Sequence, residues 1–151
     1  MVEYVGGGDS GTGITSIGSG KDYSTIAAWI ASLSDGTYSS GDDIIGELYD
    51  SSYDEAFNIG DAPFSIGGLN SVTLRANSAY KHDGTPDSGV KITYSGSVPD
   101  SSAPYTVSYD SSTYGEYKVK IEDIEFADFN NSADVHVYGF LLSEKTTIMS
   151  R

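Results

Sequence analysis

Residues 20–50 read GKDYSTIAAWIASLSDGTYSSGDDIIGELYD, a stretch that combines one short helix with the strand that follows it. Its first apolar positions fall at the spacing of a single stripe on a helix: Ile26, Trp29, Ile30 and Leu33. We therefore expect a helix over 24–33, with Ser24 or Asp22 as its N-terminal cap. Residues 42–49 then form a short β-type run between turn residues. The four apolar side chains are expected to cover the β-structure that begins there.

Short β-prone runs recur along the chain, each separated from the next by turn residues: 44–49, 71–75, 90–94, 105–109, 118–126, 135–140 and 146–149. Alternation in the second and third runs predicts aliphatic side chains facing inward, with Thr73 and Lys91 facing outward. In 118–126 the alternation continues on both sides of one extra polar residue, Asp123. That pattern predicts a corner at which the chain changes sheets. Residues 50–69 are expected to be an insertion between strands.

The phrase Asp22-Tyr23-Ser24-Thr25-Ile26, then a helix, then Gly41-Asp42-Asp43-Ile44-Ile45, resembles the entry of the pectate-lyase-like right-handed β-helix superfamily. The strand, corner and strand of 118–126 also resemble that superfamily's repeated unit, although Asp123 stands where glycine is common. The resemblance covers 20–126 and implies an all-β fold, a short right-handed parallel β-helix of about three coils with a capping helix. The superfamily includes lyases, hydrolases, esterases, phage tailspikes and structural modules, so the resemblance does not fix a function.

A β-sandwich or jelly roll of about seven or eight strands accounts for the same runs without a repeat. The length of 151 residues suits one domain with a single core. An apolar share of 38% and 18 glycines favour many turns and few long helices. We therefore expect two parts, a Gly-rich N-terminal arm over 1–20 and a β-solenoid domain over 21–151.

The net charge of −14 comes from 22 acidic and 8 basic residues, without a cluster of Lys and Arg. Nucleic acid is therefore not an expected partner. The chain has no cysteine, which excludes disulfides and thiolate metal sites. No run approaches the length of a membrane span, and the first residues lack the basic and apolar regions of a secretory signal, so we expect no membrane partner and no secretory signal.

The arm over 1–20 contains seven glycines, too many for an ordered helix or central strand. We expect it to be flexible alone and to become ordered on assembly. Tyr4, Val5, Ile14 and Ile17 are its candidate contacts with a neighbouring subunit.

The residues that could carry chemistry form no convincing site. Arg75 could serve as the base of a solenoid lyase, but it also suits a solvated strand end. Candidate carboxylates for a glycosidase are Asp42, Asp43, Asp123 and Glu125, but sequence cannot show that they converge. His82 and His136 lack the spacing of a metal site, and the acidic run 50–55 lacks that of an EF-hand. No catalytic residue, metal or other cofactor is expected.

Twelve tyrosines are many for this length, and four stand close together: Tyr105, Tyr109, Tyr114 and Tyr117. Exposed tyrosines anchor protein interfaces or stack on sugars, and buried ones pack in the core. We expect the cluster to be a protein interface, with core packing and glycan binding as alternatives.

These features together predict a non-enzymatic structural protein of a phage particle, specifically a decoration or cement protein on the capsid surface of the virion. Its partners would be capsid or other particle subunits, and it would form a homo-oligomer such as a trimer, because a short solenoid has an open edge to cover. The alternative is a carbohydrate-binding or carbohydrate-cleaving β-helix module, such as a tailspike or lyase fragment. An ice- or mineral-binding solenoid would need a flat array of threonines, which are only scattered here.

Overall fold

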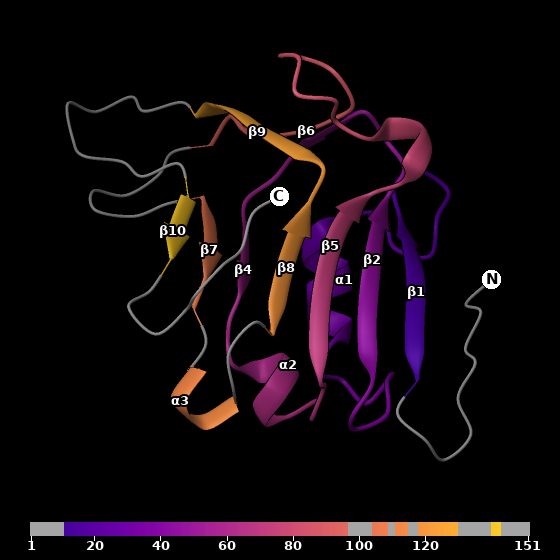
Figure 1. Cartoon of the computed structure of the whole chain (residues 1–151), viewed down its shortest axis with the longest axis vertical. Coiled ribbons are helices and arrows are strands. Elements are labelled where there is room, and N and C mark those ends of the chain that lie inside the picture. Colours follow the sequence, from indigo (N-terminus) through magenta and orange to yellow (C-terminus); the bar gives the residue numbers. More distant parts are fainter. Residues whose placement is uncertain (1–10, 97–103, 109–110, 115–117, 130–139, 143–151) are drawn as a thin grey trace.

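The computed structural model describes residues 11–96, 104–108, 111–114, 118–129 and 140–142 (Figure 1). Within them the chain is mostly strands in parallel sheets, with few and short helices. None of the helices among these residues has the length and apolar character needed to cross a bilayer.

The described strands form three sheets (Figure 1). Sheet A consists, in spatial order, of β1 (Thr12–Ile17), β2 (Asp43–Leu48), β5 (Ser71–Ala76) and β8 (Val119–Glu122). Sheet B consists of β3 (Ser52–Asp54), β6 (Val90–Tyr94) and β9 (Ile124–Phe129). Sheet C consists of β10 (Phe140–Leu142), β7 (Tyr105–Val107) and β4 (Phe57–Ile59). From β2 onward the chain visits A, B and C in turn and then returns to A, so each circuit adds one strand to every sheet.

Parallel pairing in sheet A stacks like residues from successive circuits. Ile44 lies beside Val72, which lies beside Val119, and all three are buried. Since side chains alternate along a strand, these residues share the inner face of the sheet. Each buried aliphatic side chain contributes about 1.5–3 kcal/mol, so these stacks stabilise the folded chain.

Sheet C contains one aromatic stack beside the aliphatic pair of Ile59 and Val107. Phe57 of β4 lies beside Tyr105 of β7, with their ring centroids 5.4 Å apart. Phe126 of β9 packs 4.8 Å from the Tyr105 ring, which joins sheet B to this cluster. Tilted rings at such distances stabilise one another beyond the area they bury.

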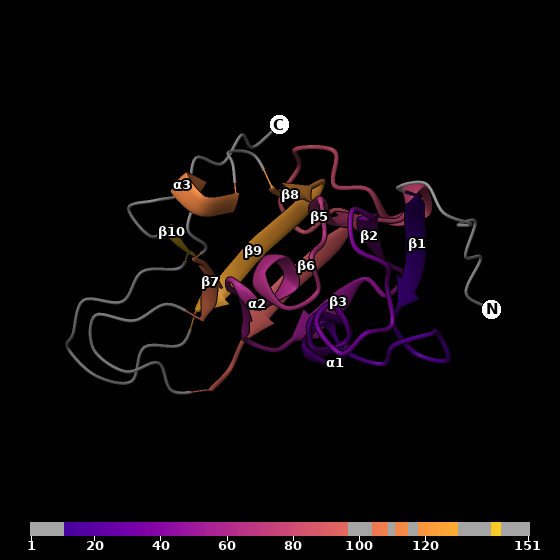
Figure 2. The same cartoon turned by 90° about the horizontal axis from the view of Figure 1, so that it is seen from below.

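Helix α1 (Ile26–Ser32) confirms the expected apolar stripe. Ile26, Trp29 and Leu33 are buried, and Ile30 is partly buried against the core. Figure 1 shows α1 behind β2 and β5, on the inner side of sheet A. Figure 2 shows the same helix near β3, so it covers the inner side of the first circuit.

The N-terminal cap of α1 differs from the prediction. Thr25 is the cap, and its hydroxyl accepts a hydrogen bond from Ala28 N. The Asp22 carboxylate instead accepts bonds from the backbone and hydroxyl of Ser16 on β1. Sequence alone could not choose, because Asp, Ser and Thr all suit this position.

The boundary of the predicted arm at residue 20 is wrong. Residues 12–17 form β1, which pairs along its whole length with β2. Ile17 is 0% exposed and belongs to the core rather than to a partner interface. The glycines suggested flexibility, but Gly13 accommodates the close Ile44 side chain and Gly18 serves the turn after β1 with a φ of 144°.

The predicted strands are confirmed where the structure describes them. β6 has the predicted bounds, and β5 ends one residue later than predicted. β2 starts and ends one residue earlier than predicted, and β7 ends at Val107, before the end of its predicted run. The corner at Asp123 separates β8 from β9, and this residue has a φ of 61°. The predicted run 146–149 lies outside the described residues, as do 135–139.

The predicted insertion 50–69 is wrong, because it contains β3, β4 and a short helix, α2 (Ala62–Ser65). Each strand is only three residues long, too short for a periodic pattern. Two other short helical elements complete the described structure: the 3₁₀ turn η1 (Ser78–Tyr80) and α3 (Ser111–Tyr114).

Candidate functional site

The outer face of sheet A carries polar side chains in rows. Alternation on β2 turns Ile44 and Leu48 inward and turns Asp43, Ile45 and Glu47 outward. The pairing then aligns outward residues across the strands. One row is Thr12, Asp43 and Ser71, the next is Ile14, Ile45, Thr73 and Lys120, and the third is Ser16, Glu47, Arg75 and Glu122.

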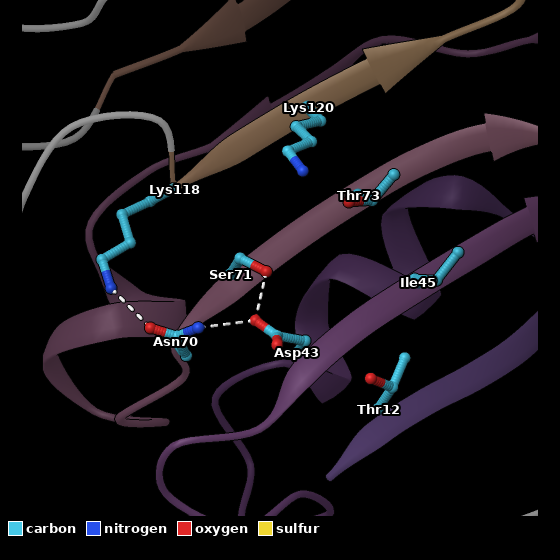
Figure 3. A pocket seen from close by; sticks show the side chains of 8 residues that line it. All are labelled: Thr12, Asp43, Ile45, Asn70, Ser71, Thr73, Lys118 and Lys120. Carbon is cyan, nitrogen blue, oxygen red and sulfur yellow. Dashed lines mark hydrogen bonds between the residues drawn. The ribbon is translucent and has the colours of Figure 1, made fainter. Parts of the chain in front are cut away.

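The first two rows border an open depression of about 480 Å³ (Figure 3). Its lining is Thr12, Asp43, Ile45, Asn70, Ser71, Thr73, Lys118 and Lys120. Hydroxyl, amide, carboxylate and ammonium groups from all four strands of sheet A, or from residues next to them, therefore face one space. The predicted outward direction of Thr73 is confirmed, although its neighbours leave it only 8% exposed.

A chain of hydrogen bonds orders one side of the depression. Lys118 Nζ donates to Asn70 Oδ1 at 3.0 Å, and Asn70 Nδ2 donates to Asp43 Oδ1 at 2.7 Å (Figure 3). The Ser71 hydroxyl donates to the same Asp43 oxygen. Asp43 Oδ2 accepts no hydrogen bond from the described residues, so it remains available to an outside donor.

Lys120 supplies the cation on the other side. Its side chain is exposed and extends from β8 over the face of the sheet (Figure 3). Within the described part of the chain it makes no hydrogen bond or ion pair. An ammonium group offers three donors, so Lys120 suits an anionic group or several hydroxyls.

The third row on the outer face contains an ion pair between Arg75 and Glu47. Arg75 donates to Glu47 Oε1 from Nε at 3.0 Å and also from its terminal nitrogen, while Asn77 and Tyr49 donate to Glu47 Oε2. Burial raises the pKa of Glu47, but the hydrogen bonds from Arg75 and Asn77 and the arginine charge outweigh it. The pKa of Glu47 therefore lies below its ordinary value. Arg75 thus holds a neighbouring strand and is not available as a lyase base.

Of the residues predicted at a protein interface, those that the structure describes do not form one exposed surface. Ile14 is 44% exposed on the outer face of β1, whereas Ile17 and Tyr105 are 0% exposed. Tyr105 was expected at an interface, and this prediction is wrong because its ring is enclosed by Phe57 and Phe126. Tyr114 is partly buried, 6.2 Å from the Phe64 ring. The remaining predicted interface residues, Tyr4, Val5, Tyr109 and Tyr117, lie outside the described residues.

The other acidic candidates are held in separate structural contacts. Asp42 is buried and accepts from the backbones of Gly11 and Ser39. Asp123 pairs with Lys81, and Glu125 accepts from the backbone of Asp87.

In the acidic run 50–55, the three carboxylates bind Ser19, Ser95 and the start of α1, respectively. No group of three metal-ligating side chains occurs among the described residues. His82 lies in the loop before β6, and His136 is outside the described residues.

The sequence interpretation missed the depression itself. Asn70 stood between the predicted insertion and the predicted run 71–75, and Lys118 and Lys120 appeared only as polar positions of one strand. The available signal was alternation, which shows that Asp43, Ser71 and Lys120 face away from the core. Their proximity depends on strand pairing between residues more than 20 positions apart, which no local pattern reveals.

No family model, curated protein or solved structure matches this chain.

Proposed function

We propose that the three sheets are the walls of a short right-handed parallel β-helix of about three coils, capped by α1. Two observations support this over a β-sandwich or jelly roll. Every pairing between described strands is parallel, whereas those alternatives are built from antiparallel strands. Each circuit also adds one strand to every sheet. The right hand follows from the strong preference of connections between parallel strands.

We further propose that the chain is a non-catalytic module that binds an oligosaccharide across the outer face of sheet A. The observation that carries this proposal is the depression in which Asp43, Asn70, Ser71 and Lys120 present donors and acceptors together. Sugar hydroxyls both donate and accept, so a site with fixed groups of both kinds suits them. The side chains of Ile14 and Ile45 add apolar surface for the C–H groups of a sugar ring.

Binding is favoured over cleavage by the placement of the two outward carboxylates of β2. Asp43 and Glu47 are four residues apart on one strand, which corresponds to about 13 Å. A glycosidase needs its two carboxyl groups about 5–9.5 Å apart. Glu47 is also occupied by Arg75 and Asn77. Glu47 therefore holds neighbouring strands together, and Asp43 is placed to bind a ligand. The two carboxylates are too far apart for the acid–base chemistry of a glycosidase.

The proposal is tested by a glycan array followed by calorimetry with the best ligand. Lys120→Ala and Asp43→Asn should each weaken binding by about tenfold. Each variant loses about one hydrogen bond to a charged group, and a loss of about 1.4 kcal/mol corresponds to a tenfold change in affinity. Lys81→Ala is the matched control, because it removes the same charge from the loop before β6 and leaves sheet A intact. Absence of any bound glycan, or equal losses in Lys81→Ala, would contradict the proposal.

A virion structural protein remains a second proposal, because Ile14, one of the residues expected to contact a partner, is exposed on β1, which is an edge strand among the strands that the structure describes. Ile17 and Tyr105 give it no support, since both lie in the chain's own core. Sedimentation velocity tests the homo-oligomer that this function implies. The wild-type chain should associate, and Ile14→Asp should shift it towards monomer. A wild-type monomer at high concentration would count against self-assembly through this edge.

A further inference from the structure

The loop over 77–89, which joins β5 to β6, is fastened to the next circuit of the chain. His82 N donates to the backbone oxygen of Asp123 at 3.1 Å, and Lys81 Nζ lies 2.9 Å from the Asp123 carboxylate. Farther along the loop, Asp87 N donates to Glu125 Oε2 at 2.8 Å. The loop of the second circuit therefore binds the third circuit at the corner between β8 and β9.

The ring of His82 sits between these two attachments. Its Nδ1 accepts a hydrogen bond from Gly84 N at 3.0 Å. A ring nitrogen that accepts carries no proton, so the neutral imidazole has its proton on Nε2. That Nε2 is buried, has no hydrogen-bond partner among the described residues, and lies 3.5 Å from Glu125 Oε2. The imidazole thus holds Gly84 on one side and faces a carboxylate on the other.

Protonation of this ring has opposite effects on its two sides. The new proton goes to Nδ1, which then faces the Gly84 N–H as a second donor, so that hydrogen bond must break. The positive charge at the same time attracts Glu125. Imidazole is the side chain that ordinarily changes charge between about pH 5 and 8.

The surrounding charged groups leave Glu125 as the partner for a protonated His82 ring. Asp123 already pairs with Lys81, and Asp87 with Lys91. Asp83, next to His82, accepts from Ser88 and Thr85. Among the groups that face His82 from the loop and from β9, Glu125 is therefore the carboxylate closest to Nε2 and without a lysine partner in the described structure.

We propose that His82 is a pH-operated switch that exchanges its hydrogen bond to Gly84, within the loop, for an ion pair with Glu125, across the two circuits. This device is independent of ligand binding on sheet A. Its effect is to loosen the turn over 82–85 while tightening the attachment of that loop to β9. Gly84 has a φ of 90°, and glycine moves between backbone regions with little cost, so the turn can rearrange once its hydrogen bond is lost.

NMR titration of the full chain between about pH 8 and 5 tests the switch, since this is the range in which imidazole titrates. The Gly84 amide signal should shift with the same midpoint as the His82 ring protons. His82→Gln, whose amide can accept from Gly84 but does not titrate, should give a Gly84 signal that stays in place. A Gly84 signal that ignores the His82 titration would overturn the proposal.

The ion-pair half of the switch has its own readout. In acid, the proton on His82 Nε2 should exchange slowly with water in the wild-type chain and rapidly in Glu125→Gln. Asp35→Asn is the matched control, because it removes one carboxylate from the turn after α1, where among the described residues the Asp35 carboxylate binds only Thr37. Equal exchange in the wild-type and Glu125→Gln proteins would show that Glu125 does not receive the protonated ring.

Discussion

Gly46 is a residue whose missing side chain makes room for the core. A Cβ atom at this position would lie 2.6 Å from Trp29 Cε2 and 2.8 Å from Ile17 Cδ1, both in fully buried side chains. Trp29 therefore sits against bare backbone of β2, which explains how so large a ring fits between α1 and sheet A.

We predict that Gly46→Ala destabilises the fold by about 1–3 kcal/mol, the usual cost of overpacking a core. Gly60→Ala is the control, because its Cβ would meet only Ser108 O at an ordinary 3.7 Å. Urea unfolding of both variants measures the difference. Equal stability of the two alanine variants would show that Trp29 can move away from β2.

Asp123 holds a left-handed backbone conformation, with a φ of 61°, at the corner between sheets A and B. Glycine adopts this conformation freely and alanine does not. We therefore predict that Asp123→Gly is more stable than Asp123→Ala by about 1 kcal/mol. Both variants lose the ion pair with Lys81, so their comparison isolates the backbone effect. Thermal unfolding in which alanine matches glycine would contradict a strained corner.

At the scale of the element, helix α1 is held by a carboxylate from a distant part of the chain. Glu55, which lies between β3 and β4, accepts from Ile26 N at 2.9 Å and from Ala27 N at 3.0 Å. Thr25 takes the N–H of Ala28. The first N–H groups of a helix lack partners within it, so Glu55 both completes the cap and opposes the positive end of the helix.

We predict that Glu55→Ala lowers the free energy of unfolding by about 1–2 kcal/mol, the range of a lost cap. Glu55→Gln should lose less, because its amide oxygen still accepts a hydrogen bond but carries no charge. Circular dichroism during urea unfolding measures both. A Glu55→Ala variant as stable as the wild type would show that water replaces the carboxylate without cost.

The pairing of β2 with β5 includes a titratable element, the ion pair of Glu47 and Arg75. The folded-state pKa of Glu47 is depressed, so the unfolded chain takes up a proton first as the pH falls. The ionised Glu47 carboxylate therefore stabilises the folded state fully above about pH 4.5. This stabilisation is lost as the pH falls through the folded-state pKa of Glu47. Unfolding free energies from about pH 7 to 3 should therefore fall more steeply for the wild type than for Glu47→Gln. Parallel curves would contradict this contribution.

Elements were predictable where their own residues repeat a pattern. The stripe of α1 and the alternation of β5 and β6 need no information from elsewhere in the chain. β3 and β4 were missed because three residues show no period, and β1 was missed because its glycines suggest flexibility. Their strand form comes from pairing with β6, β7 and β2, and such tertiary context overrides weak local preference.

At the scale of the whole molecule, the circuits explain both the core and the candidate site. Inward stacks of aliphatic residues pack beneath sheet A, while the outward rows place Asp43 next to Ser71 and Ile45 next to Thr73. The sequence indicated which residues face outward but not which ones become neighbours, since register is set by the pairing of distant strands. The depression was therefore not predictable, although the polarity of its residues was.

Two isoleucines on β1 test whether this strand is part of the folded core or a separate arm. Ile17 lies beside Leu48 and is 0% exposed, whereas Ile14 lies beside Ile45 on the outer face and is 44% exposed. We predict that Ile17→Ala destabilises the chain by about 2–5 kcal/mol, because it empties a buried site that no solvent can fill. Ile14→Ala should change stability by about 0.5 kcal/mol or less, as surface substitutions do. Urea unfolding of the two variants measures the contrast, and since both remove the same atoms from the same strand, losses of equal size would mean that β1 does not pack against the core.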